Sequence, residues 1–190
     1  LTDGWGGSMI ATDVSDILFG TPAPVVGQAN LGVLKSDMVN VIVHGHEPIL
    51  SEMIVAASQT PEIIEYAKAA GAKGVNLAGI CCTANEILMR QGVPAAGNFL
   101  HQELAILTGA VEAMVVDVQC IMQALVGLAE NFHTQVITTS PKVKITGATH
   151  IEFDEHHALE IARNILKVAI DNYKNRGEVH IPDQKEDLIP

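Results

Sequence analysis

The sequence has few cysteines and few aromatic residues. Cys81, Cys82 and Cys120 are its three cysteines, and an odd number with two adjacent is a poor framework for disulfides. We therefore expect reduced thiols and a cytoplasmic location, with the cysteines acting as metal ligands or as small buried hydrophobic residues. Aromatic residues make up 4% of the chain and apolar residues 48%. The core must therefore be mostly aliphatic.

Basic residues are also scarce, and this limits the possible partners. The 11 Lys and Arg residues against 22 Asp and Glu residues give a formal net charge of -11. An acidic surface repels the phosphates of nucleic acids and anionic lipids, so neither is an expected partner. The chain has no apolar run of about 18 residues, which a transmembrane helix would need, and its first residues are not expected to form a signal peptide. Because it also lacks an initiator Met, we expect both ends to be cuts in a longer chain.

A chain of 190 residues is long enough for one domain or a little more. Residues 1–38 are rich in Gly and Pro and are expected to form a lead-in segment, with one helical turn at 13–18. Residues 39–178 are predicted to form a single Rossmann-like domain. We expect residues 179–190 to begin a linker to a further C-terminal domain.

Short β-branched runs alternate with helical patterns in the middle region. The predicted strands are 39–43, 74–80, 113–118 and 135–139. The predicted helices are 48–57, 61–70, 83–90, 99–108, 121–131 and 154–175. This alternation indicates βαβ units and therefore an α/β fold, a parallel sheet with flanking helices.

Two of the predicted helices carry specific signals. Thr83 and Glu86 have the spacing of a capping box, so we expect Thr83 to cap the third helix. The last helix is expected to bury one apolar face against the sheet. The residues of that face are Leu159, Ala162, Ile165, Leu166, Ala169 and Tyr173.

Three side chains that can bind metals follow the carboxyl ends of three different predicted strands. His46 follows the first strand, Cys82 the second and Cys120 the third. Ligands of open α/β sheets bind beyond these strand ends, and thiolate and imidazole suit iron, nickel, copper and zinc. The spacings of 36 and 38 residues exclude a zinc finger, which uses close cysteine pairs. We expect a site assembled by tertiary structure at one edge of the sheet.

The neighbours of these three residues have more than one possible role. Cys81 is expected to pack in the core, because successive residues of a strand point in opposite directions. His44 is expected either to contact a metal ligand without binding the metal itself, or to cap a helix. Glu47 could orient His46 through a hydrogen bond or be an exposed acid at the start of a helix. Asp117 could likewise support the site or act as a cap.

Short sequence motifs along the whole chain resemble the catalytic subunit of anaerobic nickel–iron–sulfur carbon monoxide dehydrogenases, in the prismane/hybrid-cluster superfamily. The motifs occur in one order through the chain. They are DGWGGSMIAT (3–12), SDILFG (15–20), ANLGVL (29–34), HGHEP (44–48), LSEMIV (50–55), GICCT (79–83), QELA (102–105), QCI (119–121) and ITGATH (145–150).

The resemblance implies a fold, a cofactor and a reaction. The fold would be the Rossmann-like middle domain of that subunit, with a nickel–iron–sulfur cluster of the Ni-4Fe-4S type. His46 and Cys82 would ligate an iron outside the cubane part, and Cys120 an iron of the cubane part. The remaining thiolates, and the cysteines of further 4Fe-4S clusters, are not in this chain. It would therefore hold no catalytic residue beyond these ligands and would be inactive alone.

The implied reaction is CO + H₂O ⇌ CO₂ + 2H⁺ + 2e⁻, with a ferredoxin-type electron acceptor and a homodimeric enzyme. Three alternatives remain open. One is a hybrid-cluster hydroxylamine reductase, and another is a catalytically incomplete fragment or paralogue with an empty site. The third is a nucleotide-binding module, which would require GxGxxG after the first strand, where this chain has HGHEP.

Overall fold

The computed structural model describes residues 2–183, which form six strands and seven α-helices. The strands are β1 (Val39–His44), β2 (Val75–Ile80), β3 (Ala95–Gly97), β4 (Val111–Val116), β5 (Gln135–Thr138) and β6 (Thr149–His150). The helices are α1 (Thr2–Phe19), α2 (Pro48–Ser58), α3 (Pro61–Ala69), α4 (Cys81–Gln91), α5 (Gln102–Leu107), α6 (Ala124–Ala129) and α7 (Ala158–Asn172). Four short 3-10 helices accompany them, η1 (Leu31–Val33), η2 (Phe99–His101), η3 (Glu155–His157) and η4 (Tyr173–Asn175).

The strands form one sheet in the order β3-β2-β1-β4-β5-β6, and every paired strand is parallel to its neighbour. The chain moves outward from β1 in one direction and then from β4 in the other. Sheets with this order bind their ligands beyond the carboxyl ends of the two central strands, where the connections diverge. The register aligns His44 of β1 with Ile80 of β2 and Val116 of β4 at that edge. The predicted α/β fold with a parallel sheet and flanking helices is confirmed.

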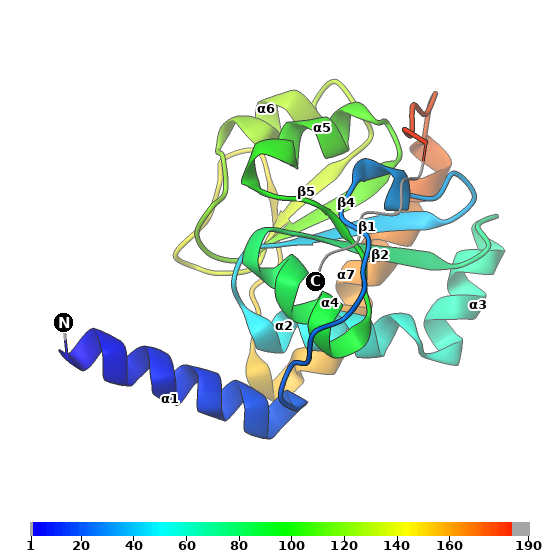
Figure 1. The fold of residues 1–190 in the computed structure, drawn as a ribbon. Helices are drawn as coiled ribbons and strands as arrows, with labels where there is room; N and C mark the ends of the chain where they lie inside the picture. Colours follow the sequence, from blue (N-terminus) through cyan, green and yellow to red (C-terminus); the bar gives the residue numbers. More distant parts are fainter. Residues whose placement is uncertain (1, 184–190) are drawn as a thin grey trace.

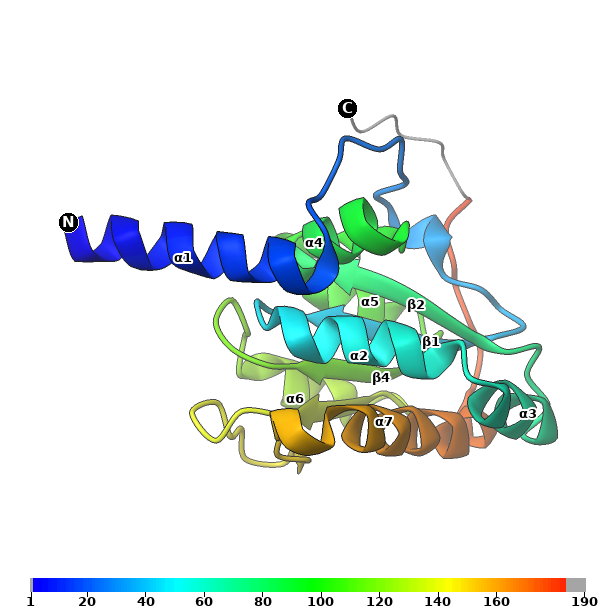
Figure 2. The same cartoon turned by 90° about the horizontal axis from the view of Figure 1, so that it is seen from below.

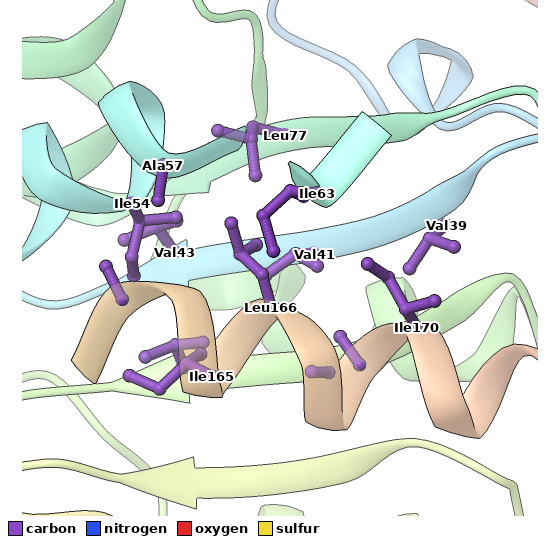
Figure 3. Close-up of a cluster of buried hydrophobic side chains, with 14 of the residues drawn as sticks. Val39, Val41, Val43, Ile54, Ala57, Ile63, Leu77, Ile165, Leu166 and Ile170 are labelled. Atoms are coloured by element: carbon purple, nitrogen blue, oxygen red, sulfur yellow. The ribbon is translucent and has the colours of Figure 1, made fainter. Parts of the chain in front are cut away.

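Helices cover both faces of the sheet, with α5 and α6 on one side and α2 and α7 on the other (Figure 1). Alternate residues of β1 serve the two sides. Val39, Val41 and Val43 pack against α2, α3 and α7 (Figure 3). Ile42 lies in the second core, under α5 and α6. A strand buried on both faces explains the nearly continuous β-branched run in the sequence, which only Asn40 interrupts.

A buried polar cluster links the end of α7 to the amino-terminal edge of the sheet. Glu112 of β4 is completely buried and accepts hydrogen bonds from the Asn40 amide at 2.6 Å and from His133 Nε2 at 2.8 Å. Arg176 pairs with both carboxylate oxygens, at 2.7 and 2.6 Å. Asn172 Nδ2 donates to the Glu112 carbonyl at 2.9 Å. The buried charge is thus fully hydrogen-bonded.

The amino-terminal segment differs from its prediction. Instead of one turn at 13–18, a helix of 18 residues spans Thr2–Phe19, and none of its residues is buried. Trp5 is 72% exposed and Ile17 is 82% exposed. Figures 1 and 2 show α1 extending away from the sheet. Its apolar residues and glycines are distributed around the whole helix, so the sequence gives no clear helical period. In residues 2–183 no helix is long and apolar enough to cross a membrane.

The predicted capping box at Thr83 is wrong, because α4 begins two residues earlier, directly from β2. The Thr83 amide donates instead to the Gly45 carbonyl at 2.9 Å, and the buried Thr83 hydroxyl has no hydrogen-bond partner within the described residues. Gly79 allows this early start, since a Cβ there would overlap the backbone of Ala84. The predicted end of the helix is confirmed by Gly92, which has a φ of 70°.

The bounds of other strands and helices also differ from the predicted ones. β4 lies two residues before the predicted 113–118, and α6 is shorter than the predicted 121–131. Leu159 lies at the exposed edge of α7, whereas the rest of the predicted face is buried or partly buried. The division at 38 and 178 stays a prediction. Of the expected linker, residues 184–190 lie outside the described part of the chain.

Candidate metal centre

The structure brings the three candidate ligands to one edge of the sheet. His46 lies two residues beyond β1, Cys82 lies in the first turn of α4 after β2, and Cys120 lies in the loop after β4. The Cys120 Sγ atom is 4.0 Å from His46 Nε2. Both Cys82 and Cys120 are exposed and form no disulfide, so their thiols are available to a ligand.

The orientation of the His46 ring is fixed by its other nitrogen. His46 Nδ1 lies 3.2 Å from the Val118 carbonyl oxygen, and a carbonyl can only accept. Nδ1 must therefore carry the proton of the neutral ring, which leaves Nε2 unprotonated and facing the Cys120 thiol. Histidine ligands of metals commonly donate their second N–H to a carbonyl or carboxylate in this way.

Backbone strain is concentrated around the same site. Within residues 2–183, the non-glycine residues with positive φ are Cys81 at 64°, Gln119 at 58° and Cys120 at 51°. Left-handed conformations are costly for residues with a Cβ, by about 1 kcal/mol or more each, and they cluster at functional sites. The junction of β2 and α4 and the loop after β4 are therefore both held in unfavourable conformations, next to the candidate ligands Cys82 and Cys120.

The adjacent cysteines have different surroundings. Cys81 is half-buried and packs against the second core, next to Ile80, whereas Cys82 is exposed. Burial, reinforced by the neighbouring Cys120 and Cys82 thiols, raises the pKa of Cys81 to about 11. Because the Cys81 thiol also interacts with the side chain of Cys120, the expected packing role of Cys81 stays a prediction.

His44 and Glu47 have distinct roles in the structure. His44 is completely buried, and neither ring nitrogen has a hydrogen-bond partner within the described residues, so it does not cap a helix. Burial lowers the pKa of its imidazole. Glu47 caps α2, because its Oε1 accepts a hydrogen bond from the Ile49 amide at 3.1 Å. Burial raises the pKa of the Glu47 carboxyl.

The loop after β1 offers no cradle for a nucleotide phosphate. Asp117 accepts hydrogen bonds from the amides of His46 and Glu47, and Glu47 accepts one from Ile49. Pro48, between them, has no N–H. The backbone donors that bind pyrophosphate in a nucleotide-binding sheet are thus occupied by carboxylates. This argues against the nucleotide-binding alternative.

Sequence reasoning left the role of Asp117 open, and the structure gives it a central place. Its carboxylate is 2% exposed and contacts the loops that carry His46 and Cys120. Burial raises the pKa of Asp117, opposed by the backbone N–H groups that it accepts. The position of Asp117 directly after a buried strand, together with Gly45 between two histidines, was the available signal.

The candidate ligands are of the residue types that bind iron–sulfur clusters. No three His, Cys, Asp or Glu side chains among residues 2–183 are placed to hold one metal ion. The donors are two thiols and an imidazole nitrogen, which are soft or borderline ligands that suit iron and nickel. The unpartnered polar atoms of His44 and Thr83 are buried beside them. These groups would surround a larger inorganic cofactor.

The chain is similar in sequence to proteins named carbon monoxide dehydrogenase. The chain is 59% identical to carbon monoxide dehydrogenase 1 of Methanosarcina mazei over 191 aligned positions, which cover 100% of this chain and 30% of the relative. It is 57% identical to carbon monoxide dehydrogenase 1 of Carboxydothermus hydrogenoformans, covering 96% of this chain and 29% of the relative. The chain thus spans about 30% of the length of these relatives.

Solved structures share the fold. A nickel-free carbon monoxide dehydrogenase from Thermococcus sp. AM4 matches with a TM-score of 0.92 and 61% identity, over 95% of this chain and 29% of that one. An acetyl-CoA synthase/carbon monoxide dehydrogenase described with NiZn[Fe4S4] and NiNi[Fe4S4] clusters matches with a TM-score of 0.90 and 55% identity, over 93% of this chain and 27% of that one. The model of the Prismane/CO dehydrogenase family matches residues 1–188. The chain therefore belongs to the Prismane/CO dehydrogenase family.

Proposed function

We propose that this chain is part of the catalytic subunit of a carbon monoxide dehydrogenase, and that it supplies His46, Cys82 and Cys120 as ligands of a Ni-4Fe-4S cluster. The complete subunit would oxidise CO with water to CO₂ and would work in reverse. When bound, the cluster would supply a soft metal that binds CO and a Lewis-acidic metal that activates water. Further 4Fe-4S clusters would lie in parts of the subunit outside this chain.

The observation that carries this proposal is the arrangement of His46 and Cys120. The His46 ring is held through Nδ1 by the Val118 carbonyl, and its unprotonated Nε2 faces the Cys120 thiol at 4.0 Å. A histidine in a solvated loop has no need of such a fixed tautomer. A ligand does, because the metal must meet the unprotonated nitrogen.

Each residue would have a separate task. His46 and Cys82 would hold the iron outside the cubane, and Cys120 would hold an iron of the cubane. His46 follows β1, Cys82 lies in α4 and Cys120 lies in the loop after β4. The rigid sheet would therefore set the distance between the CO and the water that react. The buried His44 and the half-buried Cys81 would keep bulk water away from this side of the site.

The test uses the complete subunit, the longer chain that we propose contains these residues. We expect His46→Ala, Cys82→Ala and Cys120→Ala to abolish CO-dependent viologen reduction while the protein stays soluble, since each removes a cluster ligand. Iron and nickel per subunit should fall in the same variants. The matched control is Cys81→Ala, which removes the adjacent thiol that we do not assign as a ligand, and its effect should be mild.

The same variants distinguish the alternatives. Near-normal activity of Cys82→Ala with loss in Cys81→Ala would show that the wrong cysteine was assigned. Hydroxylamine reduction without CO oxidation by the complete subunit would favour the hybrid-cluster alternative. Absence of both activities in a metal-loaded complete subunit would favour a catalytically incomplete paralogue.

The proposal extends to the partners of the complete subunit. We propose a ferredoxin-type protein as electron acceptor and a homodimer as the assembly, with CO, CO₂ and water as small-molecule substrates. A cytoplasmic location suits the free thiols of Cys81, Cys82 and Cys120. Size-exclusion chromatography with light scattering and reduction of a purified ferredoxin under CO test these two points.

A further inference from the structure

Asp117 joins the two loops that carry His46 and Cys120. It directly follows β4, and its carboxylate is buried. Its Oδ1 accepts hydrogen bonds from the His46 amide at 2.7 Å and from the Val118 amide. Its Oδ2 accepts a hydrogen bond from the Glu47 amide at 2.9 Å. One side chain thus satisfies three backbone donors in two segments about 70 residues apart in sequence.

These bonds form a closed circuit through the His46 ring. His46 Nδ1 donates to the carbonyl of Val118, the residue whose amide binds Asp117 Oδ1. The His46 amide binds the same oxygen. Both the main chain and the ring of His46 are therefore fixed relative to the segment that leads to Cys120. A shift of the carboxylate would change the direction of Nε2 and its separation from the Cys120 thiol.

Gly45 supports this interpretation independently. It has a φ of 133°, a conformation that a residue with a Cβ rarely adopts. A Cβ at this position would also overlap the Asp117 carboxylate. The backbone before His46 therefore passes Asp117 so closely that only glycine fits, and the close approach lets the carboxylate reach the amides beyond it.

Helix capping does not account for these contacts. The first turn of α2 is capped by Glu47 through the Ile49 amide, and Pro48 occupies its first position. Asp117 binds the amide of the cap residue Glu47 and that of His46 before it, and both amides lie outside the helix. Its hydrogen bonds serve the loop that carries His46.

We propose that Asp117 is a positioning residue, which sets the orientation of the His46 imidazole and its distance from the Cys120 thiol without contacting the cofactor itself. This inference rests on the proposed function, in which both residues are cluster ligands. Residues that hold a metal ligand from outside typically change metal affinity or activity by about tenfold to a hundredfold when replaced.

The test compares Asp117→Asn with Glu112→Gln in the complete subunit. Both replace a buried carboxylate by its amide, Glu112 near the start of β4 and Asp117 directly after its end. In Asp117→Asn the amide nitrogen cannot accept, so at least one backbone donor loses its partner. We expect nickel per subunit or turnover to fall about tenfold or more. We also expect a changed nitrogen hyperfine coupling of the His46 imidazole in electron–nuclear double resonance.

The Glu112→Gln control should lower the melting temperature but leave that coupling, and the nickel content of the folded protein, unchanged. An Asp117→Asn protein with unchanged coupling, nickel content and turnover would overturn the proposal. Equal spectral changes in both variants would also overturn it, because the effect would then be general destabilisation.

Gly45→Ala provides a second variant that keeps the carboxylate and displaces it. We expect the same change of the imidazole coupling as in Asp117→Asn, and no further loss in the double variant, because both substitutions break the same circuit. Additive losses in the double variant would contradict the inference. If His46→Ala leaves the nickel content and cluster spectrum intact, the proposed function fails, whatever Asp117→Asn shows.

Discussion

At the scale of single residues, Cys81 and Cys82 provide a measurable contrast within one peptide. Cys81 is half-buried and its pKa is raised to about 11, mainly by burial. At pH 8 a thiol with this pKa is about one part in a thousand thiolate, and the thiolate is the reactive form. In the reduced, metal-free chain we expect iodoacetamide to label Cys82 and Cys120 well before Cys81, as measured by fragmentation mass spectrometry.

The raised pKa of Cys81 also determines how its labelling rate changes with pH. Raising the pH toward 11 increases the thiolate fraction of Cys81, so its labelling rate should keep rising beyond pH 9. Urea-unfolded chain is the control, in which all three thiols should react alike. Faster labelling of Cys81 than of Cys82 in the folded chain would show that the buried and exposed positions are exchanged.

The candidate site was partly predictable at this scale. His46, Cys82 and Cys120 each follow a strand with a strong local signal, and parallel strands necessarily end at a common edge. The sequence could not show that Asp117 meets Gly45, because that contact depends on the register of β1 against β4. The predicted capping by Thr83 was wrong for a similar reason. The Thr83 amide binds the carbonyl of Gly45, which is distant in the sequence, and the local capping contact does not form.

At the scale of elements, α7 carries a prediction about packing. Leu166 is completely buried against the sheet, whereas Leu159, on the same helix, is 37% exposed. We expect Leu166→Ala to lower the free energy of unfolding by about 3 kcal/mol, from lost burial and the cavity left behind. Leu159→Ala is the matched control and should cost much less. Urea denaturation followed by circular dichroism measures both, and equal losses would contradict this packing.

The ion pair at the other end of α7 carries a second prediction. Arg176→Ala would leave the buried Glu112 carboxylate without its charged partner, and breaking a buried pair in this way costs about 3 kcal/mol. We expect a corresponding loss in the free energy of unfolding. Lys167→Ala breaks the exposed pair with Glu62 and should have little effect. Similar effects of the two substitutions would show that the Glu112 cluster is solvated.

The elements themselves were predictable where their signals are long. The strands β1 and β2, and the helices that begin at Pro48 and Pro61, were predicted within one or two residues. β3 and β6 were missed because they are edge strands of three and two residues, too short to show an alternating pattern. α1 was missed because no core imposes a period on it.

At the scale of the whole molecule, we expect the 190-residue chain alone neither to hold the intact cluster nor to oxidise CO. His46, Cys82 and Cys120 are too few ligands for a nickel and several irons, and they lie at an open edge of the sheet. A single zinc or iron bound by them would be adventitious. Anaerobic reconstitution with iron, sulfide and nickel, followed by metal counting and viologen reduction under CO, tests this. Stoichiometric nickel with CO-dependent reduction would contradict it.

The isolation of α1 has a consequence for hydrogen exchange. A helix of 18 residues that buries none of them is held mainly by its own hydrogen bonds, and three glycines near its start weaken it further. Its carboxyl-terminal end is tied to the domain through Arg90 of α4, which pairs with Asp16 and contacts the Ser15 and Gly20 carbonyls. Its amides should therefore exchange with deuterium far faster than those of β1, and fastest around Gly4. Whatever covers this helix would slow that exchange locally, so the exchange rate of α1 would report the docking of a partner surface directly.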